Sequence, residues 1–200
     1  MDIDSSNTAI FGVLAGSISF FAYLYYYISI CNGSTKPNRA TWWILFLIGS
    51  LIAVSYYKGG ARDTIWFALS YVIGPLIAAL LSLKYGEGKW SRVDKICLTG
   101  AIVSIPFWFI APPLTVLIIN ISVDFLGMIP TVWKSYKRPE SENRWSWALT
   151  LLSSMLNIMA IEAWEFEISI YPVYMLGING LVTTLLFKKT VGRKISKALK

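Results

Sequence analysis

The chain has 200 residues, of which 56% are hydrophobic and nine are Trp, and its mean hydropathy is +0.57. A soluble domain of this size has no interior large enough for so many apolar side chains, so the composition predicts an all-α membrane protein. The net charge of +7 does not indicate nucleic-acid binding, because the basic residues flank apolar segments instead of covering one amphipathic face.

Two further features of the composition argue against enzymatic chemistry. Histidine is absent, which removes the commonest metal ligand and the usual catalytic base. Cys31 and Cys97 have no CxxC spacing and imply no disulfide framework. We therefore expect no metal, no cofactor and no catalytic residues. The acidic start of the chain, Met1-Asp2-Ile3-Asp4, is unlike the charged region of a signal peptide.

Seven apolar segments predict membrane-spanning helices, since about 20 helical residues cross roughly 30 Å of hydrocarbon. The second, fourth and sixth segments are short, so their ends depend on interfacial Trp and Tyr. Pro112-Pro113 joins the fourth and fifth segments in a tight turn. In chain order the segments are Ala9–Cys31, Thr41–Tyr57, Thr64–Leu83, Ile96–Ala111, Leu114–Trp133, Trp147–Ile161 and Ile168–Phe187.

The distribution of basic residues predicts the orientation in the membrane. Of the 18 Lys and Arg residues, all but Lys58 and Arg62 fall on one side of a seven-span topology. The positive-inside rule then places the C-terminus in the cytoplasm and the N-terminus outside. We expect a multi-pass protein of the plasma (inner) membrane, surrounded by lipid, as a monomer or homo-oligomer. The outer Glu162, Glu165 and Glu167 predict either a cation-attracting vestibule or a solvated loop.

The sequence contains an internal repeat. Asn38-Arg39-Ala40-Thr41-Trp42 recurs as Asn143-Arg144-Trp145-Ser146-Trp147, and each copy stands where a polar loop enters an apolar run. The match continues downstream, where Thr64-Ile65-Trp66 falls opposite Ser169-Ile170-Tyr171. Repeats of this kind indicate that the chain is built from two related units.

The repeat predicts a 3+1+3 arrangement of helices. Residues 1–83 form one three-helix half and residues 114–187 the other. Between them lie a basic loop and a linker helix, residues 84–113, and residues 188–200 form a basic cytoplasmic tail. Because each half has an odd number of helices, one linker helix gives both halves the same orientation. Parallel repeats about an axis along the membrane normal are typical of transporters.

This arrangement resembles the SWEET and PQ-loop (MtN3-like) superfamily of small membrane transporters. The run from Asp124 to Pro130-Thr131 resembles the end of a family first helix, with Thr131 in place of the family Gln. The resemblance implies an external N-terminus and a Trp and an Asn along the third helix of a repeat. Trp164 and Asn179 have that separation in the second half. Gly59 and Gly74 occupy the matching positions in the first half, which implies an asymmetric pocket.

Polar residues within the apolar segments are the candidates for solute binding, because such residues usually face the interior of a bundle. Asp124 is the only ionisable residue well inside a span, and it shares a helix face with Asn120, four residues earlier. It predicts a proton or cation site, a substrate anchor or a structural hydrogen bond. Asn157 and Asn179 predict either solute contacts or hydrogen bonds between helices.

Aromatic residues could stack on the apolar face of a sugar or a planar ring. Trp66, Tyr71 and Trp164 are the candidates. Gly74-Pro75 predicts a break in the third helix, which would serve as a hinge or as packing. The candidate gating or hinge residues are Pro130, Pro75, Gly74, Arg39 and Arg144.

These features together predict a transporter that moves a small polar solute, a sugar or a sugar-like metabolite, by alternating access between two three-helix bundles. A seven-helix receptor or sensor of the related cargo-receptor plan is an alternative. A transporter of nucleoside-like vitamin precursors is another. An intramembrane enzyme has the least support, because the sequence offers few acids and bases.

Overall fold

The computed structural model describes residues 5–37, 39–86, 90, 92–137 and 139–198, and every secondary-structure element in these ranges is helical. All seven helices predicted from the sequence are present. A short 3-10 turn, η1 (Pro139–Ser141), precedes the sixth helix. The helices are α1 (Ser5–Cys31), α2 (Arg39–Lys58), α3 (Ile65–Tyr85), α4 (Arg92–Ile110), α5 (Pro113–Lys137), α6 (Arg144–Met159) and α7 (Phe166–Ala198).

Five of the described helices, α1, α2, α3, α5 and α7, are long and apolar enough to cross a membrane, so the chain is an all-α membrane protein. Helix α6 has 16 residues and is about 24 Å long, which is less than the roughly 30 Å of a hydrocarbon core. Helix α4 has 19 residues but begins with Arg92, Asp94 and Lys95. Membrane crossing by α4 and α6 stays a prediction.

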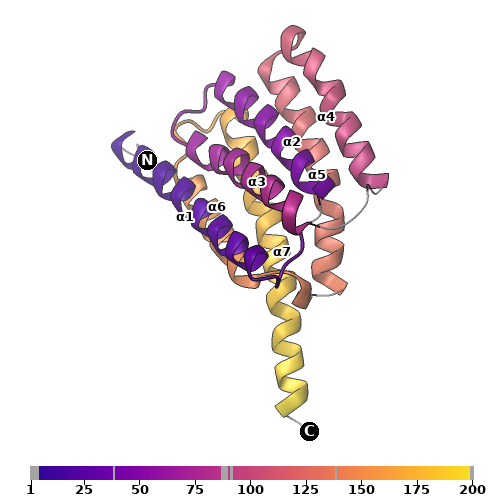
Figure 1. The fold of residues 1–200 in the computed structure, drawn as a ribbon. Coiled ribbons are helices and arrows are strands. Elements are labelled where there is room, and N and C mark those ends of the chain that lie inside the picture. The colour runs from indigo at the N-terminus through magenta and orange to yellow at the C-terminus, as the bar shows by residue number, and fades with distance from the viewer. Residues whose placement is uncertain (1–4, 38, 87–89, 91, 138, 199–200) are drawn as a thin grey trace.

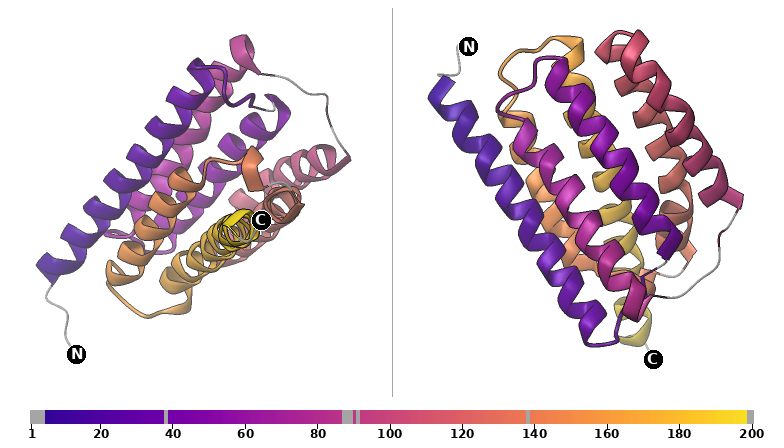
Figure 2. Two further views of the ribbon diagram at one scale, coloured as in Figure 1. Left: turned by 90° about the horizontal axis from the view of Figure 1, so that it is seen from below. Right: turned by 45° about the horizontal axis from the view of Figure 1, so that its top comes forward.

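The helices are arranged in two layers of three (Figures 1 and 2). Helices α1, α3 and α2 lie side by side in one layer, and α6, α7 and α5 lie side by side in the other. The layers meet at both edges, because α1 packs against α6 and α2 packs against α5. Helix α4 lies outside the two layers, against α2 and α5.

The repeated Asn-Arg motif serves different local purposes in its two copies. In the second copy, Asn143 is the N-cap of α6, and its side chain accepts hydrogen bonds from the backbone N–H groups of Trp145 and Ser146 at 3.1 and 3.2 Å. In the first copy, the position of Asn38 lies outside the described residues. Arg39 donates from Nε to the carbonyl oxygen of Ser82 at 2.9 Å, which joins the start of α2 to the end of α3.

Close packing between α1 and α3 depends on Gly12 and Gly16, which lie four residues apart on one face of α1. A Cβ atom at Gly12 would lie 2.0 Å from the carbonyl oxygen of Asp63. A Cβ atom at Gly16 would lie 2.7 Å from the carbonyl oxygen of Trp66. The small-xxx-small pattern therefore lets the backbone of α1 touch the loop before α3 at Gly12 and α3 itself at Gly16. It is a signal that the sequence-based reading did not use.

The predicted break of the third helix at Gly74-Pro75 is wrong, because α3 is continuous from Ile65 to Tyr85 with Pro75 inside it. Pro75 has no N–H to donate to the carbonyl oxygen of Tyr71, one turn earlier. Helix α2 comes close at this carbonyl, where a Cβ atom at Gly49 would lie 2.4 Å away. Packing against a neighbouring helix thus accommodates the proline without ending the helix.

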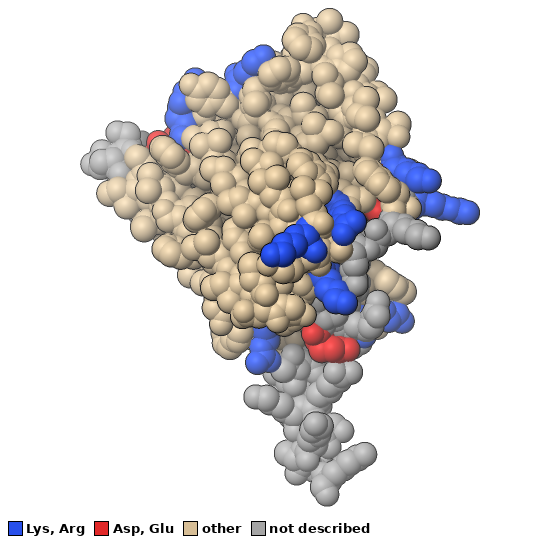
Figure 3. Space-filling model, viewed as in Figure 1, with Lys and Arg blue, Asp and Glu red and all other residues tan. Residues whose placement is uncertain are grey.

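The charged residues of the described chain lie mainly at the two ends of the helices (Figure 3). One end carries Lys58 and Arg62, beside the start of α3. The opposite end, where α3 finishes and α4 begins, carries the larger share. Helix α7 continues past the predicted end at Phe187 through the basic segment to Ala198. The basic tail is thus helical over most of its length, as Lys and Arg are good helix formers.

Candidate functional site

Asp124 of α5 is the centre of the candidate site. It is only partly buried although it lies in the middle of a helix. Its Oδ2 accepts a hydrogen bond of 2.5 Å from the hydroxyl of Tyr174 on α7. Among the described residues, Oδ1 accepts no hydrogen bond and the carboxylate has no basic partner. A carboxylate inside a membrane protein is thus left with one neutral donor.

Four tyrosines gather around this carboxylate from three other helices. Tyr174 of α7 contacts Asp124 directly, and the charge of Asp124 also acts electrostatically on Tyr23 of α1, Tyr71 of α3 and Tyr171 of α7. The Tyr23 and Tyr71 rings meet edge to face with centroids 5.8 Å apart. We call these five residues the Asp124–tyrosine site.

The ring of Phe67 lies close to tyrosines of both layers. Its ring centroid lies 5.0 Å from that of Tyr71 on the same helix, α3. It also lies 6.3 Å from the ring centroid of Tyr171 on α7. Tyr23, Tyr71 and Tyr171 therefore belong to one continuous aromatic cluster with Phe67.

Asn179 extends the polar part of the site along α7. Its Nδ2 donates to the hydroxyl of Tyr71 at 3.1 Å and to Oγ of Ser154 at 2.9 Å. These bonds join α7 to α3 in the opposite layer and to α6 in the same layer. Asn179 is almost fully buried, so two of the residues predicted from the sequence, Asn179 and Tyr71, are in direct contact.

Asn157 of α6 is fully buried, and neither end of its amide has a hydrogen-bond partner among the described residues. It lies three residues after Ser154, so both point to the same face of α6. A buried unpaired polar group costs about 1–3 kcal/mol, and an amide has two such ends. Asn157 thus presents unused donors and an acceptor one turn from the Asn179 network.

Asn120 does not join the residues around Asp124, although it lies four residues earlier on the same helix. Its Oδ1 accepts a hydrogen bond of 3.0 Å from Ser104 of α4, and its Nδ2 donates to the carbonyl oxygen of Val116 at 2.9 Å. Asn120 is fully buried. The structure therefore gives it a partner in the linker helix, whereas Asp124 turns toward α7.

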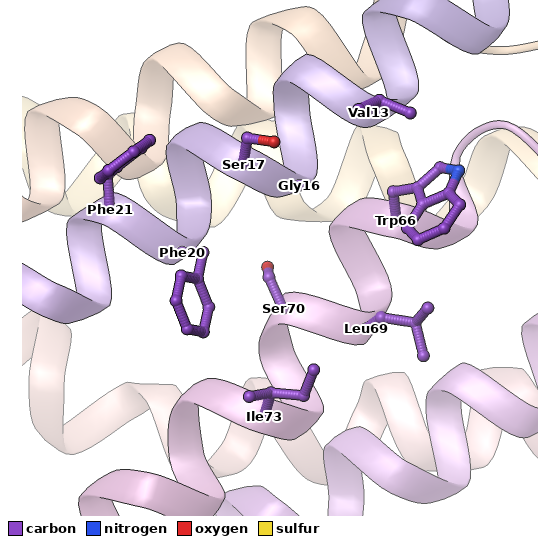
Figure 4. Close-up of a pocket in the computed structure, with 9 residues that line it drawn as sticks. All are labelled: Val13, Gly16, Ser17, Phe20, Phe21, Trp66, Leu69, Ser70 and Ile73. Atoms are coloured by element: carbon purple, nitrogen blue, oxygen red, sulfur yellow. The ribbon is translucent and has the colours of Figure 1, made fainter.

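Trp66 lies away from the aromatic cluster, with half of its surface exposed. It lines a groove of about 400 Å³ between α1 and α3, where Figure 4 shows it across from Val13. The groove is mostly apolar, and its only polar side chains are Ser17 and Ser70. This position suits contact with lipid chains.

Trp164 is not in a helix, which corrects the expectation that it shares the third helix of its half with Asn179. Helix α7 begins at Phe166, so Trp164 lies in the loop after α6, and 66% of its surface is exposed. The loop also carries Glu162 and Glu165, whose charges favour water over the bundle interior. Trp164 and Asn179 are thus not brought together.

The candidate hinge residues have packing roles. A Cβ atom at Gly74 would lie 2.3 Å from the ring of Tyr23, so glycine here makes room for one of the four tyrosines. The guanidinium of Arg144 lies over the ring of Trp145, 5.5 Å from its centroid. Arg39 links α2 to α3 as described above. Pro130 lies within α5, and its side chain is outside the described residues.

The two layers are joined at the end of the bundle beyond Asp124. Glu162, in the α6–α7 loop, accepts hydrogen bonds through Oε1 from the backbone N–H groups of Arg62 and Asp63 at 2.5 and 3.4 Å. The hydroxyl of Tyr56 on α2 donates to the carbonyl oxygen of Ile168 on α7 at 2.6 Å. We call the Glu162 contact, together with the Tyr56 bond, the loop latch.

The sequence-based prediction did not include Tyr23, Tyr171, Tyr174 or Ser154 among the candidate site residues. Tyr171 and Tyr174 lie three residues apart, and this spacing places both on one face of α7. That signal was present in the sequence. Comparisons with family models, with curated proteins and with solved structures find no match, so the function rests on the geometry of the site.

Proposed function

We propose that this protein is a membrane transporter that moves a small polar solute by alternating access between two three-helix units, α1–α3 and α5–α7. The observation that carries the proposal is the Asp124–tyrosine site. It combines an intramembrane carboxylate, phenol groups and the Asn179 amide from both units. Ionisable and amide groups in such a place usually mark a substrate or ion pathway.

The arrangement of the helices supports the relation between the two units. Exchanging α1 with α5, α2 with α6 and α3 with α7 leaves the order of neighbours unchanged around the two layers. This is the order expected for parallel repeats, with α4 as the linker helix that restores the orientation of the second unit. It also favours seven crossings, an external N-terminus and a cytoplasmic C-terminus in the plasma membrane.

The loop latch supports a gate at the external end. In alternating access, the pocket is closed on one side while it is open on the other. The latch joins the loops of the two units, α2–α3 and α6–α7, at the end of the bundle that carries Lys58 and Arg62. Its hydrogen bonds must break for the units to separate there. This conformation thus corresponds to a transporter that is closed to the outside.

The proposal is tested by uptake into proteoliposomes that contain the purified protein, with a panel of radiolabelled sugars, nucleosides and small amines. Asn179→Ala removes the bonds to Tyr71 and Ser154. We expect it to lower uptake about tenfold or more, which corresponds to 1.4 kcal/mol, because the amide that positions Tyr71 and Ser154 at the site is lost. Asp124→Asn should abolish uptake.

The control is Thr184→Ala, because Thr184 lies on the exposed surface of the same helix as Asn179. This variant should transport like the wild type, and all variants should give the same size-exclusion profile. Wild-type uptake in both Asn179→Ala and Asp124→Asn would remove the proposed site. Binding of a probe without any uptake would instead favour a receptor.

A further inference from the structure

The carboxylate of Asp124 needs a positive partner that the described chain does not supply. Among the described residues, Tyr174 gives one neutral hydrogen bond to Oδ2, and Oδ1 accepts none. Removing a carboxylate from water is costly unless it is paired or well hydrogen-bonded. The apolar parts of α5 and α7 contain no basic residue, because no Lys or Arg lies between Lys95 and Lys134 or between Arg144 and Lys188.

The residues around Asp124 also favour a positively charged ligand. Tyr174 donates to its Oδ2, and Tyr71 packs against the rings of Tyr23 and Phe67. The faces of aromatic rings carry negative charge density and attract organic cations. An anionic solute would meet the Asp124 charge without any compensating cation. A neutral solute would leave the carboxylate unpaired. The site is thus electrostatically matched to a cation.

The same site has features that a bare metal ion or a proton does not need. The amide of Asn157 is buried with both ends unpaired, and Asn179 lies nearby in a network with Ser154. These groups suit the polar part of an organic molecule whose charged part lies at Asp124. Aromatic side chains are the usual partners of quaternary ammonium groups, whereas small metal ions prefer several oxygen ligands.

We infer that Asp124 is the counter-ion of the transported solute, and that this solute is a small organic cation. The inference rests on the proposed function for the transport step, but binding of the cation can be tested by itself. The ammonium or similar group lies against the Asp124 carboxylate and the tyrosine rings, while its polar substituent reaches Asn179 or Asn157.

The binding test compares choline with 3,3-dimethylbutan-1-ol, which has the same shape without the positive charge. The purified protein in lipid nanodiscs is titrated with each compound while intrinsic Trp and Tyr fluorescence is recorded. We expect choline to bind and the neutral alcohol to bind at least about tenfold more weakly, which corresponds to 1.4 kcal/mol or more. Asp124→Asn should remove this difference.

Glu165→Gln is the matched control, because it deletes one negative charge at an exposed position in the α6–α7 loop. It should keep the preference of the wild type for choline. If Glu165→Gln lost the preference for choline as Asp124→Asn does, the preference would depend on general surface charge. That result would overturn the inference. Equal binding of choline and the alcohol by the wild type would overturn it as well.

The transport test uses proteoliposomes with a potassium gradient and valinomycin, so that an interior-negative potential can be imposed. Uptake of labelled choline should rise with that potential and disappear in Asp124→Asn. Asp124-dependent binding of choline without uptake would support the inference while contradicting the proposed transport function. Uptake of a neutral sugar that is driven by a pH gradient and lost in Asp124→Asn would overturn the inference, because Asp124 would then carry a proton.

Discussion

Asn157 is the residue of the candidate site whose hydrogen bonding is most unusual. Its amide is buried between helices, yet neither its oxygen nor its nitrogen has a partner among the described residues. Packing asparagines in membrane helices normally bond to another helix, as Asn120 does with Ser104. The unpaired amide of Asn157 therefore lowers stability, and the proposed solute site would supply it with a partner.

Replacing Asn157 by leucine, which has a similar volume, should raise stability and abolish uptake. The variant removes two unpaired polar ends, and each such end costs about 1–3 kcal/mol. Thermal unfolding followed by tryptophan fluorescence measures stability, and proteoliposome uptake measures function. Ser153→Ala is the comparison that should lower stability, because Ser153 donates a hydrogen bond to the carbonyl oxygen of Ala15. A less stable Asn157→Leu protein would contradict this assignment.

At this scale the sequence predicted some members of the site and not others. Asp124 and Asn179 stood out because polar residues are rare inside apolar segments. Asn120 stood out for the same reason, yet it bonds to α4. The direction in which a helix face points depends on its neighbours, and no single-helix pattern contains that information. Tyr23 was missed because tyrosines are also common at membrane interfaces.

At the scale of the elements, the sequence predicts the seven helices but not which helices pack against each other. Helix existence follows from the length and apolar character of each segment, and all seven appear. The two-layer order of α1, α3 and α2 depends on contacts such as the one between Gly12 and Asp63. The structure also lengthens α7 and places Trp164 before it, since helix ends are the least certain feature of a sequence-based prediction.

Substituting alanine at Gly12 tests the contact between α1 and α3. A Cβ atom there would lie 2.0 Å from a backbone oxygen that cannot move without moving α3. We expect Gly12→Ala to lose about 1–3 kcal/mol of stability, as overpacked sites do, with a corresponding fall in the melting temperature.

Gly177 provides the matched control on α7, because a Cβ atom there would meet nothing within 4 Å. Alanine is favoured over glycine by about 0.5–1 kcal/mol inside a helix, so Gly177→Ala should be neutral or slightly stabilising. Equal melting temperatures for Gly12→Ala and the wild type would show that α1 does not touch the backbone of Asp63, in the loop before α3, at Gly12.

At the scale of the whole molecule, the two layers contact each other at the Asp124–tyrosine site and at the loop latch. The sequence repeat predicted two related halves, and the order of helix neighbours is compatible with that. The sequence does not predict the latch, because Glu162 and Arg62 lie 100 residues apart and belong to different halves. The sequence predicts only a vestibule or a solvated loop for Glu162.

Removing the Glu162 carboxylate should open the end of the bundle that carries the loop latch. Ala61 is fully buried beside the latch, so Ala61→Cys reports on opening through its reaction with a membrane-impermeant maleimide. The exposed Cys31 is first replaced by serine. In this background Glu162→Ala should speed labelling about tenfold, since a hydrogen bond to a charged group contributes about 1.5–3 kcal/mol.

Glu165→Ala serves as the control for that experiment, because Glu165 lies in the same loop and is exposed. It should label at the rate of the parent protein. If Glu162→Ala labels no faster than Glu165→Ala, then the Glu162 contact does not hold the two units together.

The latch also has an evolutionary consequence. Glu162 accepts two of its bonds from main-chain N–H groups at positions 62 and 63 and a third from the hydroxyl of Thr64, and every amino acid except proline supplies such an N–H group. The two main-chain bonds to Glu162 therefore do not depend on which side chains stand at positions 62 and 63, although Asp63 itself accepts a hydrogen bond from Thr8. Selection would act on the acidic residue opposite them and against proline.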